Sequence, residues 1–183
     1  MKQSNRGKAV IVGIFAVALL LSSYAWWHQF QQGRRCRELF GTKAVQLIRL
    51  APQVELLRLE QKSALASHLN PPEGTLRIAG DTVLISQHVE ITGTSGLLHA
   101  RHALLQDINY QWDASRSDCT SHWSFALRFS QNGEDVIIAF DTKCNRVGLN
   151  GSENTGPLLP ELMQTFDDKS DEWESRVLGD DGR

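Results

Sequence analysis

The longest feature in the pattern of apolar and polar positions is an uncharged, apolar run from Ala9 to Trp27. As a helix, its roughly 19 residues would measure about 28 Å, close to the hydrocarbon thickness of a bilayer. Tyr24, Trp26 and Trp27 gather at its C-terminal end, and such amphipathic rings favour the headgroup region. The run therefore predicts a transmembrane or signal-anchor helix.

A cleavable secretory signal is the competing interpretation, because Ser23-Tyr24-Ala25 fits a cleavage site and a basic segment precedes the run. Cleavage after Ala25 would release a secreted domain. We favour the uncleaved anchor, since cleavage would leave Trp26 and Trp27 exposed at the new N-terminus. Both interpretations predict export.

A second clear pattern lies in the C-terminal half, where apolar and polar side chains alternate strictly from Ser121 to Gln131. This alternation predicts a half-buried strand. Asn132-Gly133 follows, and this dipeptide favours a type I′ turn because both positions need positive φ. The return strand is Asp135 to Thr142. The apolar faces then coincide, with Phe129 opposite Val136, Leu127 opposite Ile138, Phe125 opposite Phe140, and Trp123 on the same core face.

Two cysteines flank this hairpin. The register places Cys144 opposite Ser121, two residues from Cys119, which favours a disulfide between them over two unrelated thiols. The bridge would close a loop of about 25 residues and stabilise the fold by about 3 kcal/mol. Structural disulfides persist in oxidising compartments, so the bridge predicts that the chain after residue 28 lies outside the cytoplasm. Cys36 is either free or paired between chains.

The hairpin also carries a resemblance. The stretch from Cys119 to Phe129, continued by Ala139 to Cys144, resembles small, uncharacterised, exported or membrane-anchored bacterial proteins in which a cysteine precedes an apolar-aromatic strand and another follows the return strand. The resemblance covers this hairpin alone. It implies an exported fold and no site residues.

The remaining segments predict an α+β fold, with an antiparallel sheet and helices at one side. Pro52 ends a helix that spans Glu38 to Leu50, and Gln53 to Glu60 is either a strand or part of a second helix that runs toward His68. The other expected elements are a break at Asn70 to Gly74, strands at Thr75 to Ala79 and Thr82 to Ile91, a turn at Thr92 to Gly96, a helix rather than a strand at Leu97 to Gln106, a loop at Gly148 to Gly156 and a short helix at Pro157 to Phe166.

Charge divides the chain further. Residues 1–37 carry lysines and arginines but no carboxylate, whereas the chain from Asp167 onward is acidic with few apolar residues. The formal net charge of -2 offers no global basic surface, so we expect no nucleic-acid partner. The predicted segments are a basic N-terminus at 1–8, the apolar helix at 9–27, a basic juxtamembrane linker at 28–37, one α+β domain at 38–166 and a disordered acidic tail at 167–183.

Candidate chemistry is sparse. His99-x-x-His102 would share a helix face and, with His88, form a metal site; the alternative is surface histidines, because no paired zinc-ligand motif accompanies them. Arg101 and Arg128 lie in apolar segments and would suit an anionic ligand, or simply extend from an edge into water. The sequence contains no nucleophile elbow or nucleotide-binding loop, and we expect no cofactor.

These observations predict a membrane-tethered envelope interaction or accessory module without catalytic activity. Its expected partners are the lipid bilayer, through residues 9–27, and a protein that the sequence does not identify. The alternatives are a metal-binding protein or metal-dependent enzyme that uses His88, His99 and His102, and a binder of small anionic ligands that uses Arg101 or Arg128.

Overall fold

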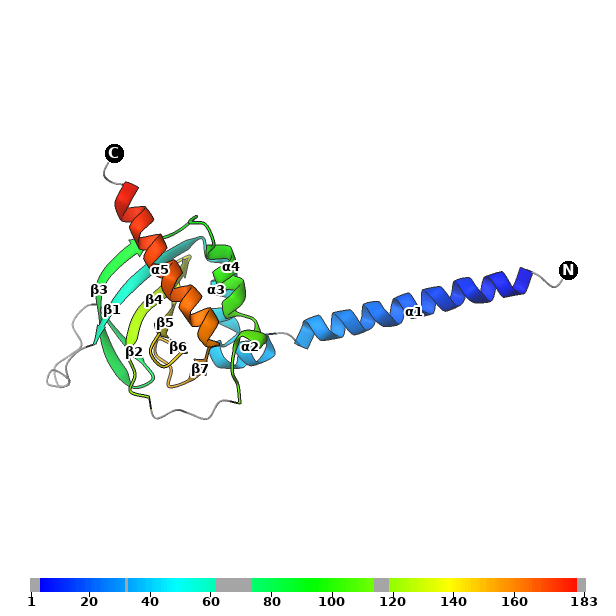
Figure 1. Ribbon diagram of the computed structural model, residues 1–183, viewed down its shortest axis with the longest axis horizontal. Helices are drawn as coiled ribbons and strands as arrows, with labels where there is room; N and C mark the ends of the chain where they lie inside the picture. Colours follow the sequence, from blue (N-terminus) through cyan, green and yellow to red (C-terminus); the bar gives the residue numbers. More distant parts are fainter. Residues whose placement is uncertain (1–3, 32, 62–73, 114–118, 181–183) are drawn as a thin grey trace. The chain divides into compact units, whose positions relative to one another are not determined.

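The computed structural model describes residues 4–31, 33–61, 74–113 and 119–180 (Figure 1). The chain forms two compact units, Met1–Arg34 and Arg35–Arg183. The first unit contains helix α1 (Ser4–Gln31). Every side chain from Val10 to Trp27 is exposed, and the mean hydropathy of this window is 2.0. The predicted apolar helix is thus present, and it continues beyond Trp27.

The second unit is α+β, as predicted. Its helices and strands follow in the order α2 (Arg34–Phe40), α3 (Thr42–Leu50), β1 (Gln53–Gln61), β2 (Thr75–Ile78), β3 (Asp81–Glu90), α4 (Leu97–Leu104), the short 3₁₀ helix η2 (Asp107–Asn109), β4 (Trp123–Gln131), β5 (Glu134–Asp141), β6 (Arg146–Leu149), β7 (Thr155–Pro157) and α5 (Pro160–Asp180).

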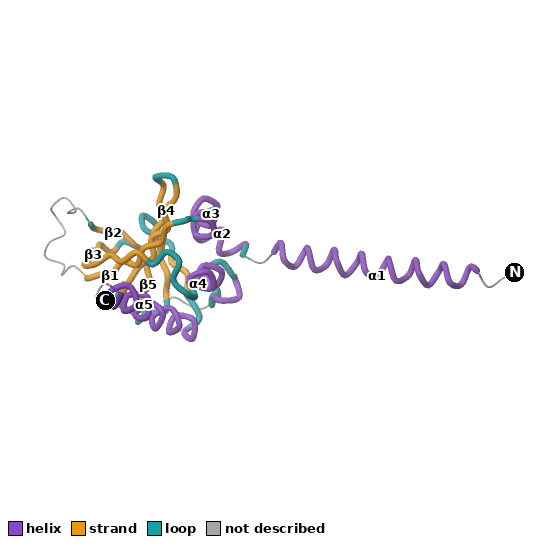
Figure 2. The backbone as a smooth tube through the Cα atoms, turned by 90° about the horizontal axis from the view of Figure 1, so that it is seen from above, coloured by secondary structure: helices purple, strands orange, loops and turns teal. Residues whose placement is uncertain are grey.

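The seven strands form one antiparallel sheet in the order β2-β3-β1-β4-β5-β6-β7. The sheet curls into a half-barrel, visible in Figures 1 and 2. The edge strand β2 lies close to the opposite end of the sheet. There the Ala79 N–H donates to the Ser152 carbonyl at 2.9 Å, and the Gly151 N–H donates to the Arg77 carbonyl at 2.7 Å. The β6–β7 turn is therefore fastened to the end of β2.

Curling gives the sheet two separate apolar clusters. One face packs against helices α2 to α5 and contains Phe125, Leu127 and Phe129 together with residues of all four helices. The other face forms a smaller cluster inside the half-barrel, with Leu57, Ile78 and seven other buried residues. We refer to these as the helix-side core and the inner core.

The hairpin register is confirmed: Phe129 pairs with Val136, Leu127 with Ile138 and Phe125 with Phe140. Asn132 and Gly133 have φ values of 53° and 81°, as a type I′ turn requires. The prediction that Trp123 shares the face of Phe125 is wrong. The register shifts between these two residues, and an added residue in one strand reverses the side of what precedes it. Trp123 therefore lies in the inner core, where its Nε1 donates to Asp81 Oδ2 at 3.0 Å.

The predicted loop from Gly148 to Gly156 is too long, since β6 and β7 extend into both ends of it. Gly148 lies within β6, at a position where the inner core leaves no room for a side chain. A Cβ at this position would lie 2.6 Å from Ile78 Cγ2 and 2.9 Å from the Trp123 ring. Glycine is therefore required here by packing and not by a turn.

The N-terminal boundary of the domain also differs from the prediction. Residues 28–31 belong to α1 and residues 34–37 to α2, so both ends of the predicted basic linker are helical. The helix expected from Glu38 to Leu50 does end at Leu50, but Gly41, with φ of 82°, divides it into α2 and α3. The undecided stretch from Gln53 is strand β1. The possible continuation toward His68 and most of the predicted break at Asn70 to Gly74 lie outside the described residues.

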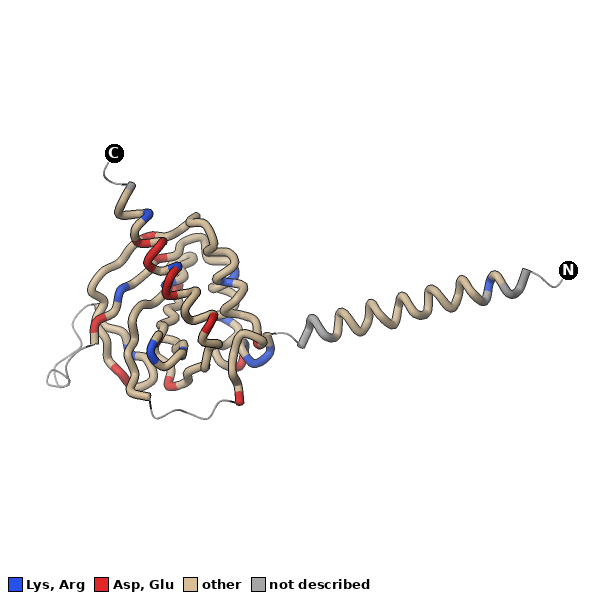
Figure 3. The backbone as a smooth tube through the Cα atoms, viewed as in Figure 1, with Lys and Arg blue, Asp and Glu red and all other residues tan. Residues whose placement is uncertain are grey.

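The predicted disorder of the acidic segment is wrong from Asp167 to Asp180, because α5 extends from Pro160 to Asp180. Figure 3 shows carboxylate positions recurring along this helix. Its inner side is nevertheless buried: Ser170 and Trp173 have no exposed area, and Met163 and Phe166 have almost none. These positions are spaced by three or four residues, which places them on one helix face, and that face packs into the helix-side core.

Candidate functional site

The disulfide end of the hairpin is built around a buried carboxylate. Cys119 and Cys144 form a disulfide with their Cα atoms 5.9 Å apart. Asp141, with no exposed area, accepts the Cys144 N–H at 2.9 Å and Arg146 Nη2 at 2.8 Å. The same Arg146 nitrogen lies 3.0 Å from Ser121 Oγ. These contacts hold the segment before β4 against the end of β5, so the cluster is structural.

The predicted metal ligands do not come together. His88 lies exposed on β3, and His99 and His102 lie exposed on α4. Within the described ranges, no group of three or more histidine, cysteine, aspartate or glutamate side chains is arranged to hold a metal ion. The helix at 97–104 does bring His99 and His102 onto neighbouring positions, but the third ligand from β3 does not join them.

The two arginine candidates differ in their surroundings. Arg128 forms ion pairs with Glu55 at 3.0 Å and with Asp135 at 3.5 Å, so its charge is already balanced by the sheet. The Arg101 guanidinium lies over the Phe129 ring, 5.5 Å from the centroid, and burial lowers its pKa. Its hydrogen bond is to the Arg49 carbonyl, at 3.5 Å. Of the two, Arg101 is the one without a carboxylate partner among the described residues.

Cys36 is free and buried in the helix-side core. Burial, with the nearby Asp107 carboxylate, raises the pKa of its thiol, which keeps it protonated and unreactive at neutral pH. Asp107 also accepts the backbone N–H groups of Arg35 at 3.0 Å and Cys36 at 2.8 Å, and so caps the first turn of α2. Cys36 is thus a packing residue, and its burial makes it inaccessible to a second chain.

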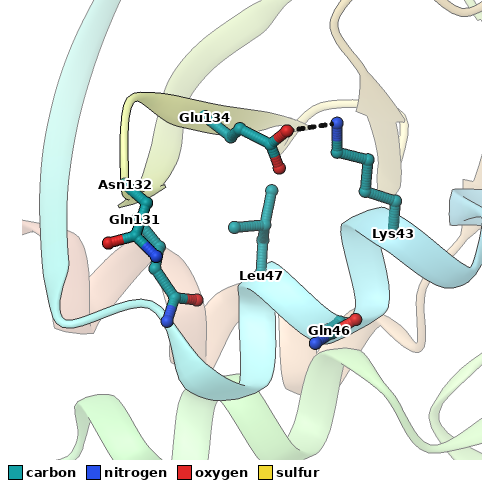
Figure 4. A pocket seen from close by; sticks show the side chains of 6 residues that line it. All are labelled: Lys43, Gln46, Leu47, Gln131, Asn132 and Glu134. Atoms are coloured by element: carbon teal, nitrogen blue, oxygen red, sulfur yellow. Dashed lines mark hydrogen bonds and ion pairs between the residues drawn. The ribbon is translucent and has the colours of Figure 1, made fainter.

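A polar pocket of about 400 Å³ lies between α3 and the tip of the hairpin. Figure 4 shows Lys43 reaching from α3 to Glu134 of β5, with Nζ 2.8 Å from Oε1. The other polar side chains are the amides of Gln46, Gln131 and Asn132. The pocket offers hydrogen-bond donors and acceptors but lacks a serine, threonine or cysteine nucleophile. No local sequence pattern indicates this pocket, because Lys43 and Glu134 are 91 residues apart.

A second hollow, which we name the α4–α5 groove, is apolar and has a volume of about 380 Å³. Ala100 and Ala103 of α4 face Leu162 and Phe166 of α5 across it. Its titratable lining residues are His99 and Lys169. In the sequence, the small residues of α4 were an available signal, but their opposition to α5 depends on a helix that was not predicted to extend to Lys169.

Comparisons of the chain with protein families, with curated proteins and with solved structures found no match. What the protein does therefore has to be inferred from its own residues and from the arrangement described above.

Proposed function

We propose that this protein is a single-pass membrane protein whose disulfide-bonded domain lies outside the cytoplasm and acts as an interaction or accessory module without catalytic activity. The observation that carries the proposal is α1. Its window from Val10 to Trp27 has a mean hydropathy of 2.0, and none of it is buried within the protein. An apolar helical surface of this length is stabilised by a bilayer and disfavoured by water.

The disulfide supports the proposed compartment. Cys119 and Cys144 are bonded, and disulfides of this kind persist in the periplasm or outside the cell. This arrangement fits the proposed likeness to exported or membrane-anchored bacterial proteins with a cysteine-flanked hairpin. If a signal peptidase instead cleaves after Ala25, the same domain is secreted, and the compartment is unchanged.

The surface of the domain supports a binding role. The polar pocket offers amides and one ion pair, and the α4–α5 groove offers an apolar surface; both suit recognition more than bond cleavage. A second candidate function is the binding of a small anionic ligand at Arg101, which lacks a carboxylate partner among the described residues. Guanidinium groups without such a partner suit carboxylates and phosphates.

Membrane attachment can be tested with the full chain. Val17→Arg combined with Leu20→Arg places two cations in the middle of α1, at a cost of about 2.5–3.5 kcal/mol each. We expect this variant to leave the alkali-washed membrane fraction, and the matched control Val17→Leu with Leu20→Val to stay in it. Equal retention of both variants contradicts an α1 anchor.

The compartment needs a separate measurement. In intact cells, thiol alkylation without reductant should fail to label Cys119 and Cys144, and the same cells should show the bridged peptide after digestion. In cells that lack the machinery for forming exported disulfides, we expect both thiols to become labelled. If the bridge forms equally well in those cells, or both thiols are labelled in normal cells, the proposed topology is incorrect.

A further inference from the structure

The α4–α5 groove combines an apolar interior with a cationic end. Ala100 and Ala103 on one side and Leu162 and Phe166 on the other supply its walls. Its volume of about 380 Å³ falls in the range of about 300–1,000 Å³ that is typical of sites for small ligands. The part of a ligand that enters must therefore be narrow and apolar.

The groove has little hydrogen-bonding capacity for a polar ligand. Its one hydroxyl belongs to Thr165, which already donates to the Glu161 carbonyl at 2.8 Å. A peptide backbone or a sugar ring inside this groove would leave polar groups without partners, at a cost of about 1–3 kcal/mol for each group. A hydrocarbon chain has no such groups.

Lys169 places an ammonium group at one end of the groove. The side chain of Lys169 lies over Gly96, with its Cδ and Cε 3.8 Å from where a Cβ would be. Its ammonium pairs with Glu172, and Glu172 also pairs with Arg176. One carboxylate is therefore shared between two cations. An anionic group at this end is favoured.

We propose that the α4–α5 groove binds one acyl chain that carries an anionic head group, with the chain along Ala103 and Phe166 and the head group near Lys169. A free fatty acid and the chain of an anionic phospholipid share this chemistry. The inference rests on the folded domain alone and not on the membrane topology. A result that contradicts the proposed topology therefore leaves the proposed acyl-chain site unaffected, and the reverse also holds.

The test uses the full chain in phosphatidylcholine nanodiscs with a dodecanoic acid that bears a photoreactive group near its methyl end. After irradiation, we expect labelled peptides from α4 and α5 in addition to those from α1, which labels through the bilayer. Ala103→Leu fills the groove and should reduce the α4 and α5 labels at least fivefold. Leu98→Ala, at an exposed position of the same helix, should leave them unchanged.

Competition separates the chain from the head group. Each methylene between decanoate and dodecanoate should strengthen competition by about fourfold. Lys169→Gln should weaken dodecanoate about two- to fivefold, as expected for an exposed ion pair, and leave dodecanol unaffected. A phospholipid with the same photoreactive chain identifies the source by whether it labels α4 and α5 as well. The proposal is overturned if labels are confined to α1, or if Ala103→Leu does not reduce the labels on α4 and α5. The head-group assignment is overturned if Lys169→Gln affects dodecanoate and dodecanol equally.

Discussion

Replacing Trp173 by alanine should destabilise the domain strongly, because this residue secures α5. The indole has no exposed area, lies in the helix-side core, and donates from Nε1 to the Ser95 carbonyl at 3.0 Å. Truncation of a buried tryptophan to alanine costs about 3–5 kcal/mol from lost apolar burial and the cavity that remains. The Ser95 carbonyl also loses its partner, which adds to the cost if water does not replace it.

Cys36 provides the assay. Of the three cysteines it alone is free, and it is buried in the same core that Trp173 enters. Alkylation of Cys36 therefore reports opening of this core in the full chain, within a membrane or a nanodisc. A loss of about 3–5 kcal/mol should raise the labelling rate by about 10² to 10⁴ when opening is a rapid equilibrium.

Two variants calibrate the measurement. Trp173→Phe keeps most of the ring volume but loses the hydrogen bond, so we expect a loss of about 1–2 kcal/mol. Leu178→Ala removes a side chain that is 54% exposed and should change the free energy of opening by less than about 0.5 kcal/mol. If Trp173→Ala labels at the same rate as Leu178→Ala, α5 does not complete the core and the packing described above is incorrect.

Three further predictions concern covalent structure, attachment and the inner core. Non-reducing peptide mapping should recover the Cys119–Cys144 crosslink, and Cys119→Ser should lower the free energy of unfolding by about 2–5 kcal/mol; recovery of both cysteines as free thiols argues against it. A chain that begins at Gln31 should remain in the supernatant, and its sedimentation with membranes at high salt would reveal a second attachment. Gly148→Ala should destabilise the domain by about 1–3 kcal/mol, since the added Cβ would lie 2.6 Å from Ile78 Cγ2. The control Gly179→Ala, where an added Cβ has nothing within 4 Å, should show no such loss. Equal melting temperatures for the two variants contradict the inner-core packing.

The elements that sequence alone predicted well are those with a strong local cause. Helix α1 follows from an uninterrupted apolar run, and the β4–β5 hairpin follows from alternation of period two together with Asn132-Gly133. The proximity of Cys119 and Cys144 follows from the hairpin register. In each case the information lies within about 25 residues of chain, so no distant contact was needed.

For α5, local sequence patterns predicted a helix only as far as Phe166, whereas the helix extends to Asp180. The series Met163, Phe166, Trp173 has helical spacing, but Asp167, Asp168 and Ser170 interrupt its apolar character. In the folded protein, Arg58 of β1 meets this acidic side of the helix, with Nη2 2.6 Å from Asp171 Oδ1 and Nη1 3.1 Å from Ser170 Oγ. A residue more than a hundred positions earlier thus pairs with the acidic segment and helps to hold α5 against the sheet.

The candidate sites belong entirely to tertiary structure. In the sequence, His88, His99 and His102 formed a candidate set of metal ligands, but strand β3 and helix α4 hold them apart. The polar pocket, which forms where α3 meets the hairpin tip, and the α4–α5 groove likewise join segments that are distant in the sequence. Periodicity determines which face of an element is buried, and the sequence by itself therefore determined the apolar helix α1, the hairpin and most strands. Which faces meet, and what space their side chains leave between them, depends on the packing of distant segments, so only the tertiary structure decided where the polar pocket and the α4–α5 groove lie.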